Sequence, residues 1–282
     1  MTTGRRTVAT GQGEVAYLAS GEGPTAVFVH GVFLSADLWR PQLAALADVR
    51  RCLAVDLLAH GESFVPTAGT LSMDLQAEMI VALLDALGLD AVDLVGNDSG
   101  GAIAQLVAVR VPQRVRTLTL TNCDTHDNWP PAAFAPIHDL AVAGALADAL
   151  GAIAVDPAAA RASLASGFED PDVLSDETVA SFFGPFAASP ARRQAVEGYV
   201  AGMDNRVTVA IRDDLARFDA PTLIVWGTAD DFFDIAWARW LADTIPGTVR
   251  CVELPGAKLF FPAERADEFN AELRRFWTEA PA

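Results

Sequence analysis

The chain is poor in basic charge, and it contains no long unbroken apolar run. Its 282 residues include 20 Lys and Arg against 37 Asp and Glu, which gives a formal net charge of −17. Such a charge repels phosphate backbones and anionic membrane surfaces, so we expect neither a nucleic acid nor a membrane as a partner. With 51% hydrophobic and 20% charged residues, the composition predicts one large globular domain, with or without an inserted subdomain.

The scarcity of cysteine excludes two further classes of protein. Cys52, Cys123 and Cys251 stand in or beside apolar runs and form no close pair, which argues against a disulfide framework or a structural zinc site. Residues 1–19 lack the apolar core of a signal peptide, and the longest apolar stretch, 141–155, is too short to span a bilayer. We therefore expect a cytoplasmic protein.

Short apolar runs alternate with helical periodicities along most of the chain. The runs predict strands at residues 14–19, 26–29, 53–55, 92–95, 115–120, 222–226 and 248–254. The periodicities predict helices at 71–87, 102–111 and 263–277, and a further helix that contains Trp237 and Leu241. This alternation indicates an α/β fold with a mostly parallel sheet flanked by helices.

The alternation is interrupted between residues 130 and 205. This segment has helical periodicity with many Ala, Gly and Pro residues and no convincing strand. We interpret it as a helical cap inserted into a core made of residues 1–129 and 206–282. A helical insert of this kind would suit a lid over a binding site.

The sequence GNDSGG at residues 96–101 is the sharpest functional signal. It lies between a predicted strand and a predicted helix, with small residues two places before and two places after Asp98. That spacing permits a sharp strand–turn–helix which exposes the central side chain at the positive end of the helix, so Asp98 occupies a nucleophile position. Ser99 is one place out of register, and its backbone N–H is better placed as an oxyanion donor. The alternative is a glycine-rich turn without chemistry.

On these residues the chain resembles the α/β-hydrolase superfamily over nearly its whole length. His30-Gly31 resembles the family's His-Gly oxyanion loop, Asp56 with HGES at 60–63 resembles its Asp…Gly-His-Gly-x-Ser loop, and WGTAD at 226–230 resembles its acid loop. An Asp at the elbow is similar to the haloalkane dehalogenase and epoxide hydrolase branch. The resemblance implies that the Asp carboxylate attacks carbon and forms an ester, which a His-activated water then hydrolyses.

The resemblance also implies roles for the residues around the elbow. Asp230 stands at the acid position and would orient a His, although it could instead be a helix N-cap. The backbone N–H of Val32 or Phe33 would be the second oxyanion donor. His30 and His60 are more typical of residues that hold their loops by hydrogen bonds.

The chain departs from the family at the base. The family pattern Gly-x-x-His-Phe matches GAKLF at residues 256–260, so Leu259 stands where the His is expected. Leucine cannot take a proton from water. Apart from His30 and His60, the only histidines are His126 and His138. His126 follows the strand at 115–120, and since the carboxyl ends of parallel strands face the site, His126 or its neighbour Asp124 could reach the pocket.

Two other interpretations stay open. Asp98 could act as a general acid or base in a non-hydrolytic ring opening, cyclisation, isomerisation or elimination. The protein could also be a catalytically inactive, ligand-binding relative.

The chain matches neither subfamily fully. Epoxide hydrolases of this type carry two lid tyrosines, whereas this chain has only Tyr17 in a strand and Tyr199 in the cap. Dehalogenases of this type have a Trp after the nucleophile, where this chain has Ser99. Tyr199 could be one proton donor, and Trp129 could line the pocket.

The sequence therefore predicts a hydrolase-like enzyme that uses Asp98, Asp230 and His126 on a small or medium-sized apolar electrophile, an epoxide or an alkyl halide. We find no phosphate-binding, metal-ligating, haem or flavin motif, so we expect no cofactor and no metal. The oligomeric state is open, with a homodimer as one option.

Overall fold

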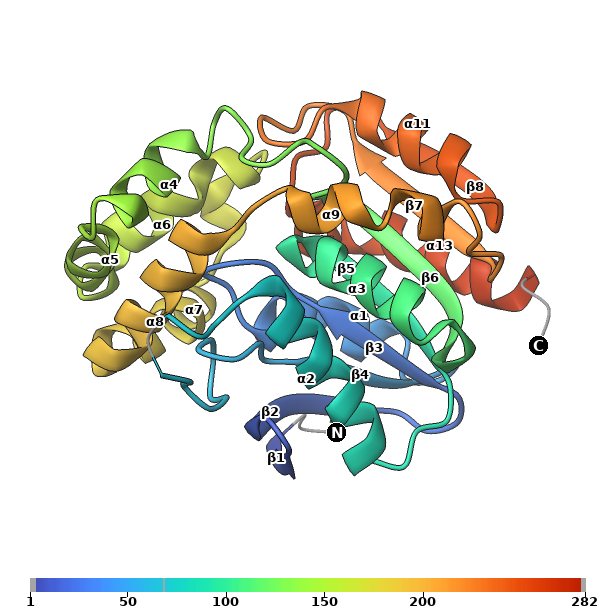
Figure 1. Cartoon of the computed structure of the whole chain (residues 1–282), viewed down its shortest axis with the longest axis horizontal. Coiled ribbons are helices and arrows are strands. Elements are labelled where there is room, and N and C mark those ends of the chain that lie inside the picture. Colours follow the sequence, from blue (N-terminus) through green and yellow to red (C-terminus); the bar gives the residue numbers. More distant parts are fainter. Residues whose placement is uncertain (1–3, 68, 280–282) are drawn as a thin grey trace.

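The computed structural model describes residues 4–67 and 69–279, and its centre is an eight-stranded sheet (Figure 1). The strand order is β1-β2-β4-β3-β5-β6-β7-β8. β1 and β2 pair antiparallel, as do β2 and β4, and every other pair is parallel. The strands are β1 (Arg5–Thr10), β2 (Gly13–Ser20), β3 (Thr25–Val29), β4 (Arg51–Val55), β5 (Val92–Asp98), β6 (Val115–Cys123), β7 (Thr222–Gly227) and β8 (Thr248–Leu254). The predicted α/β fold with a mostly parallel sheet is confirmed.

Helices cover both faces of this sheet. α2 and α3 pack together over one face, and α1, α12 and α13 pack together over the other (Figure 1). The α-helices are α1 (Arg40–Ala45), α2 (Met73–Ala86), α3 (Ser99–Arg110), α4 (Ala135–Val142), α5 (Leu146–Ala154), α6 (Pro157–Leu164), α7 (Asp176–Ala188), α8 (Pro190–Gly202), α9 (Arg206–Ala210), α10 (Arg212–Leu215), α11 (Ile235–Thr244), α12 (Phe261–Glu264) and α13 (Ala266–Glu279). Short 3-10 helices lie at η1 (Ala36–Trp39), η2 (Pro112–Arg114), η3 (Ala165–Gly167) and η4 (Pro171–Val173).

The two central strands continue past their apolar stretches. β5 ends at Asp98 and not at residue 95, and β6 ends at Cys123 and not at residue 120. Their polar ends still pair, with Asn97 opposite Thr121 and Asp98 opposite Cys123. The apolar runs alone underestimated the length of these strands, because the hydrogen bonds between paired strands form between backbone groups whatever the side chain. The extension places polar residues of both strands side by side at the carboxyl edge of the sheet.

Five of the helices between β6 and β7, α4 to α8, form a separate group. Figure 1 shows α4 to α8 gathered at one side of the molecule, away from the helices that flank the sheet. Phe182, Phe186 and Tyr199 of α7 and α8 are buried, and the ring of Phe186 packs edge-on against Phe33 in the loop after β3, 6.5 Å between centroids. The cap boundaries at residues 130 and 205 stay a prediction.

Within the described part of the chain, no single helix is long and apolar enough to cross a membrane. The pair α4 and α5, bent by 116°, meets that test only when the two are taken together.

Candidate active site

Asp98 occupies a strained elbow between β5 and α3. Its backbone lies in the left-handed region (φ 57°, ψ −136°), which is uncommon for a residue with a Cβ and typical of functional turns. The turn requires small neighbours: a Cβ on Gly96 would lie 2.5 Å from the carbonyl oxygen of Gly100, and one on Gly100 would lie 2.4 Å from that of His30. The sharp strand–turn–helix expected at these glycines is therefore present.

The carboxyl group of Asp98 lies against the backbone of the loop after β3. The backbone N–H groups of Ser99 and Val32 lie close enough to it to favour its ionised form, and a Cβ on Gly31 would lie only 1.9 Å from its Oδ2 atom. Of the two alternatives for the second N–H donor, Val32 is the one in contact, while Phe33 turns its ring toward the cap. Burial nevertheless raises the pKa of Asp98 to about 7, and the nearby Asp230 adds to the rise.

Asp230 is held by β6 as well as by its own loop. Its carboxylate accepts hydrogen bonds from Asn122 Nδ2 (2.6 Å) and from the backbone N–H of Phe232 (2.9 Å). Asn122 in turn exchanges two hydrogen bonds with the backbone of Gly227, at 2.7 and 3.1 Å. Burial raises the pKa of Asp230 to about 6, which outweighs these donors. The helix that follows is capped by Asp234 and not by Asp230.

Leu259 lies in a partly exposed loop that is hydrogen-bonded to the loop of Asp230. Its side chain is buried, and its carbonyl oxygen accepts a hydrogen bond from Asn97 Nδ2 (3.0 Å), next to the elbow. The backbone N–H of Ala229 donates to the carbonyl of Ala257 (3.0 Å), which joins the two loops. The residue at the position of the family's His is thus an apolar side chain at the edge of the site.

His126 makes its contacts at the surface. Its ring stacks on Trp237 and packs against Trp240, with centroids 6.3 and 4.7 Å apart, and its Nδ1 atom lies 3.1 Å from a carboxylate oxygen of Asp127. Among the described residues, none of these ring contacts involves Asp98 or Asp230. The proposed role of His126 as the replacement base therefore gains no support from these contacts and stays a prediction.

His30 and His60 are completely buried, and their ring centroids lie 5.5 Å apart. His30 accepts a hydrogen bond from the backbone N–H of Leu57 at Nε2 (3.1 Å) and lies 2.7 Å from the carbonyl of Gly31 at Nδ1, so it joins the loops after β3 and β4. Burial lowers the pKa of both imidazoles, that of His60 to about 4. Both are neutral near pH 7, and His30 has the loop-holding contacts that the sequence indicated.

Tyr199 and Trp129 connect the site to the cap. The hydroxyl of Tyr199 is buried. Burial raises its pKa, and Asp124 and Asp98 raise it further, which indicates that both carboxyls lie nearby. Ser99 lies close enough to offset this rise in part, although the two hydroxyls do not meet the geometry of a hydrogen bond. Trp129 donates its Nε1–H to the carbonyl of Met203 (2.9 Å) and packs against aromatic rings of the cap.

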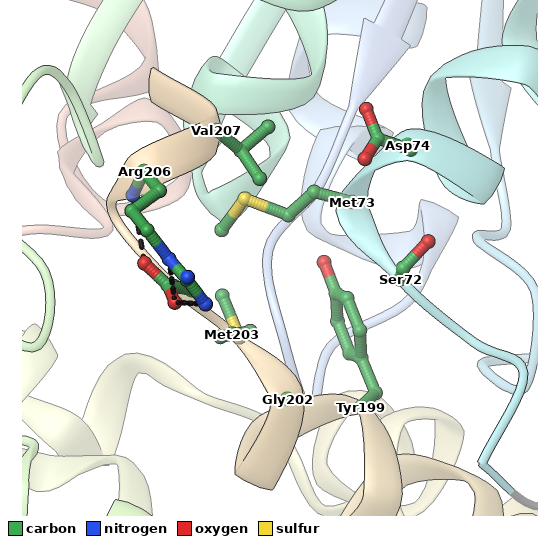
Figure 2. Close-up of a pocket in the computed structure, with 9 residues that line it drawn as sticks. Ser72, Met73, Asp74, Tyr199, Gly202, Met203, Arg206 and Val207 are labelled. Carbon is green, nitrogen blue, oxygen red and sulfur yellow. Dashed lines mark hydrogen bonds and ion pairs between the residues drawn. The ribbon is translucent and has the colours of Figure 1, made fainter. Parts of the chain in front are cut away.

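A cavity of about 470 Å³ opens beside Tyr199, between the start of α2, the end of α8 and α9 (Figure 2). Met73, Met203 and Val207 make its lining partly apolar, and an Asp204–Arg206 ion pair stands at one side. Tyr199 is the lining residue that also neighbours Asp98, while Asp98, Asp124 and Asp230 are not part of the lining.

Two residues of the site, Asn97 and Asn122, had no role in the sequence-based prediction. The Nδ2 amide group of Asn97 donates hydrogen bonds to Thr121 Oγ1 (3.0 Å) and to the carbonyl oxygen of Leu259 (3.0 Å). Asn122 positions Asp230. Asp124, predicted from the sequence as an alternative to His126 that could reach the pocket, is fully buried. The sequence feature that could have revealed these residues is the presence of polar side chains at the ends of two adjacent buried strands. No group of His, Cys, Asp or Glu side chains in the described residues could hold a metal ion.

The family described as "alpha/beta hydrolase fold" matches residues 24–264. Haloalkane dehalogenase 2 of Mycobacterium tuberculosis (strain ATCC 25618 / H37Rv) is 31% identical over 278 residues, covering 93% of this chain and 91% of that protein. Among solved structures, an alpha/beta hydrolase fold protein from Burkholderia ambifaria superposes with a TM-score of 0.82 at 25% identity, covering 95% of this chain and 96% of that one. The epoxide hydrolase CorEH superposes with a TM-score of 0.81 at 21% identity, over 98% of each chain.

The fold, the elbow and these matches define the class: the chain belongs to the α/β-hydrolase fold family. Within that family it is a homologue of the haloalkane dehalogenases.

Proposed function

We propose that this protein is a cofactor-independent hydrolase in which the Asp98 carboxylate attacks a small or medium-sized apolar electrophile, an epoxide or an alkyl halide. The observation that carries the proposal is the placement of Asp98: a strained elbow presents its carboxyl group against Gly31, and the N–H groups of Val32 and Ser99 lie near enough to favour its ionised form. The same donors would stabilise the oxyanion that forms when water attacks an Asp98 ester.

The surroundings of the elbow support an apolar substrate. The ring of Phe33 packs against Phe134 and Phe186, with centroids 6.3 and 6.5 Å away, and Trp129 packs against Phe134 at 5.1 Å. Aromatic walls of this kind bind apolar carbon skeletons and exclude water from the reacting atoms.

The proposal is tested by the mass of the intact protein after incubation with a panel of epoxides and alkyl halides. We expect the mass of the alkyl group to be added at Asp98 and to be absent in Asp98→Asn, because an amide is a poor nucleophile. Asp172→Asn, a change at an exposed carboxylate of the cap, is the control and should react like the wild type. If no member of the panel modifies Asp98, the proposal is wrong.

Gly31→Ala should reduce the rate of this reaction by about 10²-fold, because the new Cβ displaces the carboxyl group of Asp98 and a misplacement of about 1 Å has a cost of that size. Gly184→Ala is the matched control, since a Cβ at that position meets nothing within 4 Å. The measurement is the rate of adduct formation in both variants. Equal rates would show that the carboxyl group does not lie against Gly31.

A second candidate function is a non-hydrolytic reaction in which Asp98 exchanges a proton with the substrate. The pKa of about 7 favours it, because a general acid or base works best when its pKa is near the working pH. Product formation that requires Asp98 without any adduct would select this function. Ligand binding without turnover would select the inactive binding protein.

A further inference from the structure

Several buried side chains in the region of the elbow carry polar atoms that have no hydrogen-bond partner within the described residues: Ser99 adjoins Asp98, Asp124 and Tyr199 interact electrostatically with it, and the ring of His60 packs against Tyr199. The atoms are Asp124 Oδ1 and Oδ2, Ser99 Oγ, Tyr199 Oη and His60 Nε2. They come from separate elements, namely the end of β6, the start of α3, α8 and the loop after β4. Unpaired buried polar atoms are rare in proteins, so this concentration indicates a ligand with polar atoms of its own.

Asp124 is the most exceptional member of this group. It follows directly after Cys123, the residue that pairs with Asp98 across β5 and β6. Its backbone is fixed, since Gln105 Nε2 donates to its carbonyl (2.9 Å) and Thr125 Oγ1 donates to Gln105 Oε1 (2.9 Å). The main chain at Asp124 is thus held firmly while both carboxyl oxygens stay unpaired. A carboxyl group held in this way serves the site and not the stability of the fold.

The surroundings of Asp124 keep it uncharged. Burial and the carboxyl group of Asp98 raise its pKa well above the ordinary value, and the other ionisable groups that face it are Cys123 and Tyr199. No Arg, Lys or His of the described residues is bonded to its side chain. An ionised carboxylate without a partner is very costly to bury, whereas a neutral carboxylic acid is not. Asp230 differs, because Asn122 and Phe232 donate to it.

We infer that Asp124 is the proton donor and acceptor for the reaction at Asp98, and that the substrate therefore has oxygen as its leaving atom, as in an epoxide. This inference rests on the proposed function and selects between its two substrate classes. It also assigns to the carboxylic acid of Asp124, just after β6, the proton transfers for which the chain has no His at position 259.

The two steps balance in protons. In the first, an Asp98 oxygen forms a bond to an epoxide carbon, the carbon–oxygen bond breaks, and the released oxygen takes the proton of Asp124. The products are a hydroxyalkyl ester and an ionised Asp124. In the second, water adds to the ester carbon of Asp98 and gives a proton to Asp124, and the ester breaks to release a diol. Epoxide and water become diol, and Asp98 and Asp124 return to their starting forms.

An alkyl halide leaves Asp124 without a role. Halide departs as an anion and needs no proton, so Asp124 stays protonated after Asp98 is alkylated. A protonated carboxyl cannot act as a base toward water, and the ester should persist. The two substrate classes therefore have different fates in the same site.

The test compares styrene oxide with phenethyl bromide, which shares its carbon skeleton. We expect the wild type to convert styrene oxide repeatedly to its diol and to be alkylated once per molecule by the bromide. Asp124→Asn should reduce diol formation by about 10²–10⁴-fold, the usual contribution of general acid–base catalysis, and should keep the rate of alkylation by the bromide. Asp127→Asn, in the same loop but more than half exposed, is the control and should leave both rates unchanged.

An infrared spectrum supplies a readout apart from turnover. At about pH 8, where Asp98 (pKa about 7) and Asp230 (pKa about 6) are mostly ionised, the wild type should show the band of a protonated carboxyl group, and Asp124→Asn, or Asp124→Ser if the first variant does not fold, should lose most of it. Wild-type diol formation in Asp124→Asn, repeated turnover of the bromide by the wild type, or a wild-type spectrum without that band would each overturn the inference. Absence of any adduct at Asp98 with both probes would instead overturn the proposed function.

Discussion

Leu259→His is expected to convert the single alkylation by an alkyl halide into repeated turnover. After alkylation, the Asp98 ester needs a water molecule that has lost a proton, and neither Leu259 nor a protonated Asp124 can accept one. A general base typically contributes about 10²–10⁴-fold, which corresponds to roughly 3–5 kcal/mol of barrier. An imidazole at position 259 should supply most of that factor.

The structure gives an imidazole at this position its orienting partners. Lys258 forms an ion pair with Asp231 (2.9 Å), and Asn97 binds the carbonyl of Leu259, so this backbone is fixed between the elbow and the acid loop. Asp230 stands in that loop with its carboxylate already positioned by Asn122. A carboxylate that binds the second ring nitrogen holds the imidazole in the productive tautomer and stabilises its protonated form.

The measurement is the amount of bromide released per molecule of enzyme. Leu259→Met is the matched control, since it keeps the volume and apolar character of the side chain, and it should stop after one equivalent. Combining Leu259→His with Asp230→Asn should remove most of the gain. If Leu259→His changes nothing while His126→Ala abolishes wild-type turnover, the base is His126 and our account of position 259 is wrong.

The parts of the site that lie close together in sequence could be predicted. The elbow is a local property of Gly96, Asp98 and Gly100, because small residues at fixed spacing are enough to permit the turn. The sheet followed from apolar runs, and the strand predicted at residues 248–254 coincides with β8. β1 was not predicted, because this edge strand (Arg5–Thr10) contains Arg and Thr and buries little of its surface.

The residues that join distant segments could not be predicted in the same way. Asn122 binds residues 105 and 108 positions away in the sequence, and Asn97 binds Leu259, 162 positions away. The sequence pattern around an Asn does not show which backbone or side chain its amide will meet. Asp124 was difficult for the opposite reason: its carboxyl group is distinguished by having no partner, which only the surrounding fold can reveal.

Asp98→Asn should abolish the reaction and at the same time stabilise the fold at alkaline pH. The ordinary pKa of an Asp is 3.8 and that of Asp98 is raised to about 7. Between these values the folded protein keeps a proton that the unfolded chain releases. The free energy of unfolding of the wild type should therefore fall as the pH rises from about 4 to about 7, by up to about 1.4 kcal/mol per pH unit, and then level off. The Asn side chain does not ionise and lacks this contribution.

Urea unfolding of the wild type and Asp98→Asn at about pH 5 and about pH 8 measures the difference. At about pH 8 the free energy of unfolding of the variant should exceed that of the wild type by about 2–4 kcal/mol, and this difference should become smaller toward acidic pH. Asp172→Asn, at an exposed carboxylate, should follow the wild type at both values. Parallel pH profiles for the wild type and Asp98→Asn would show that Asp98 ionises as it does in the unfolded chain. A gain in stability together with total loss of the reaction would show that Asp98 lowers the free energy of unfolding of the wild type. That is expected for a residue whose role is chemical and not structural.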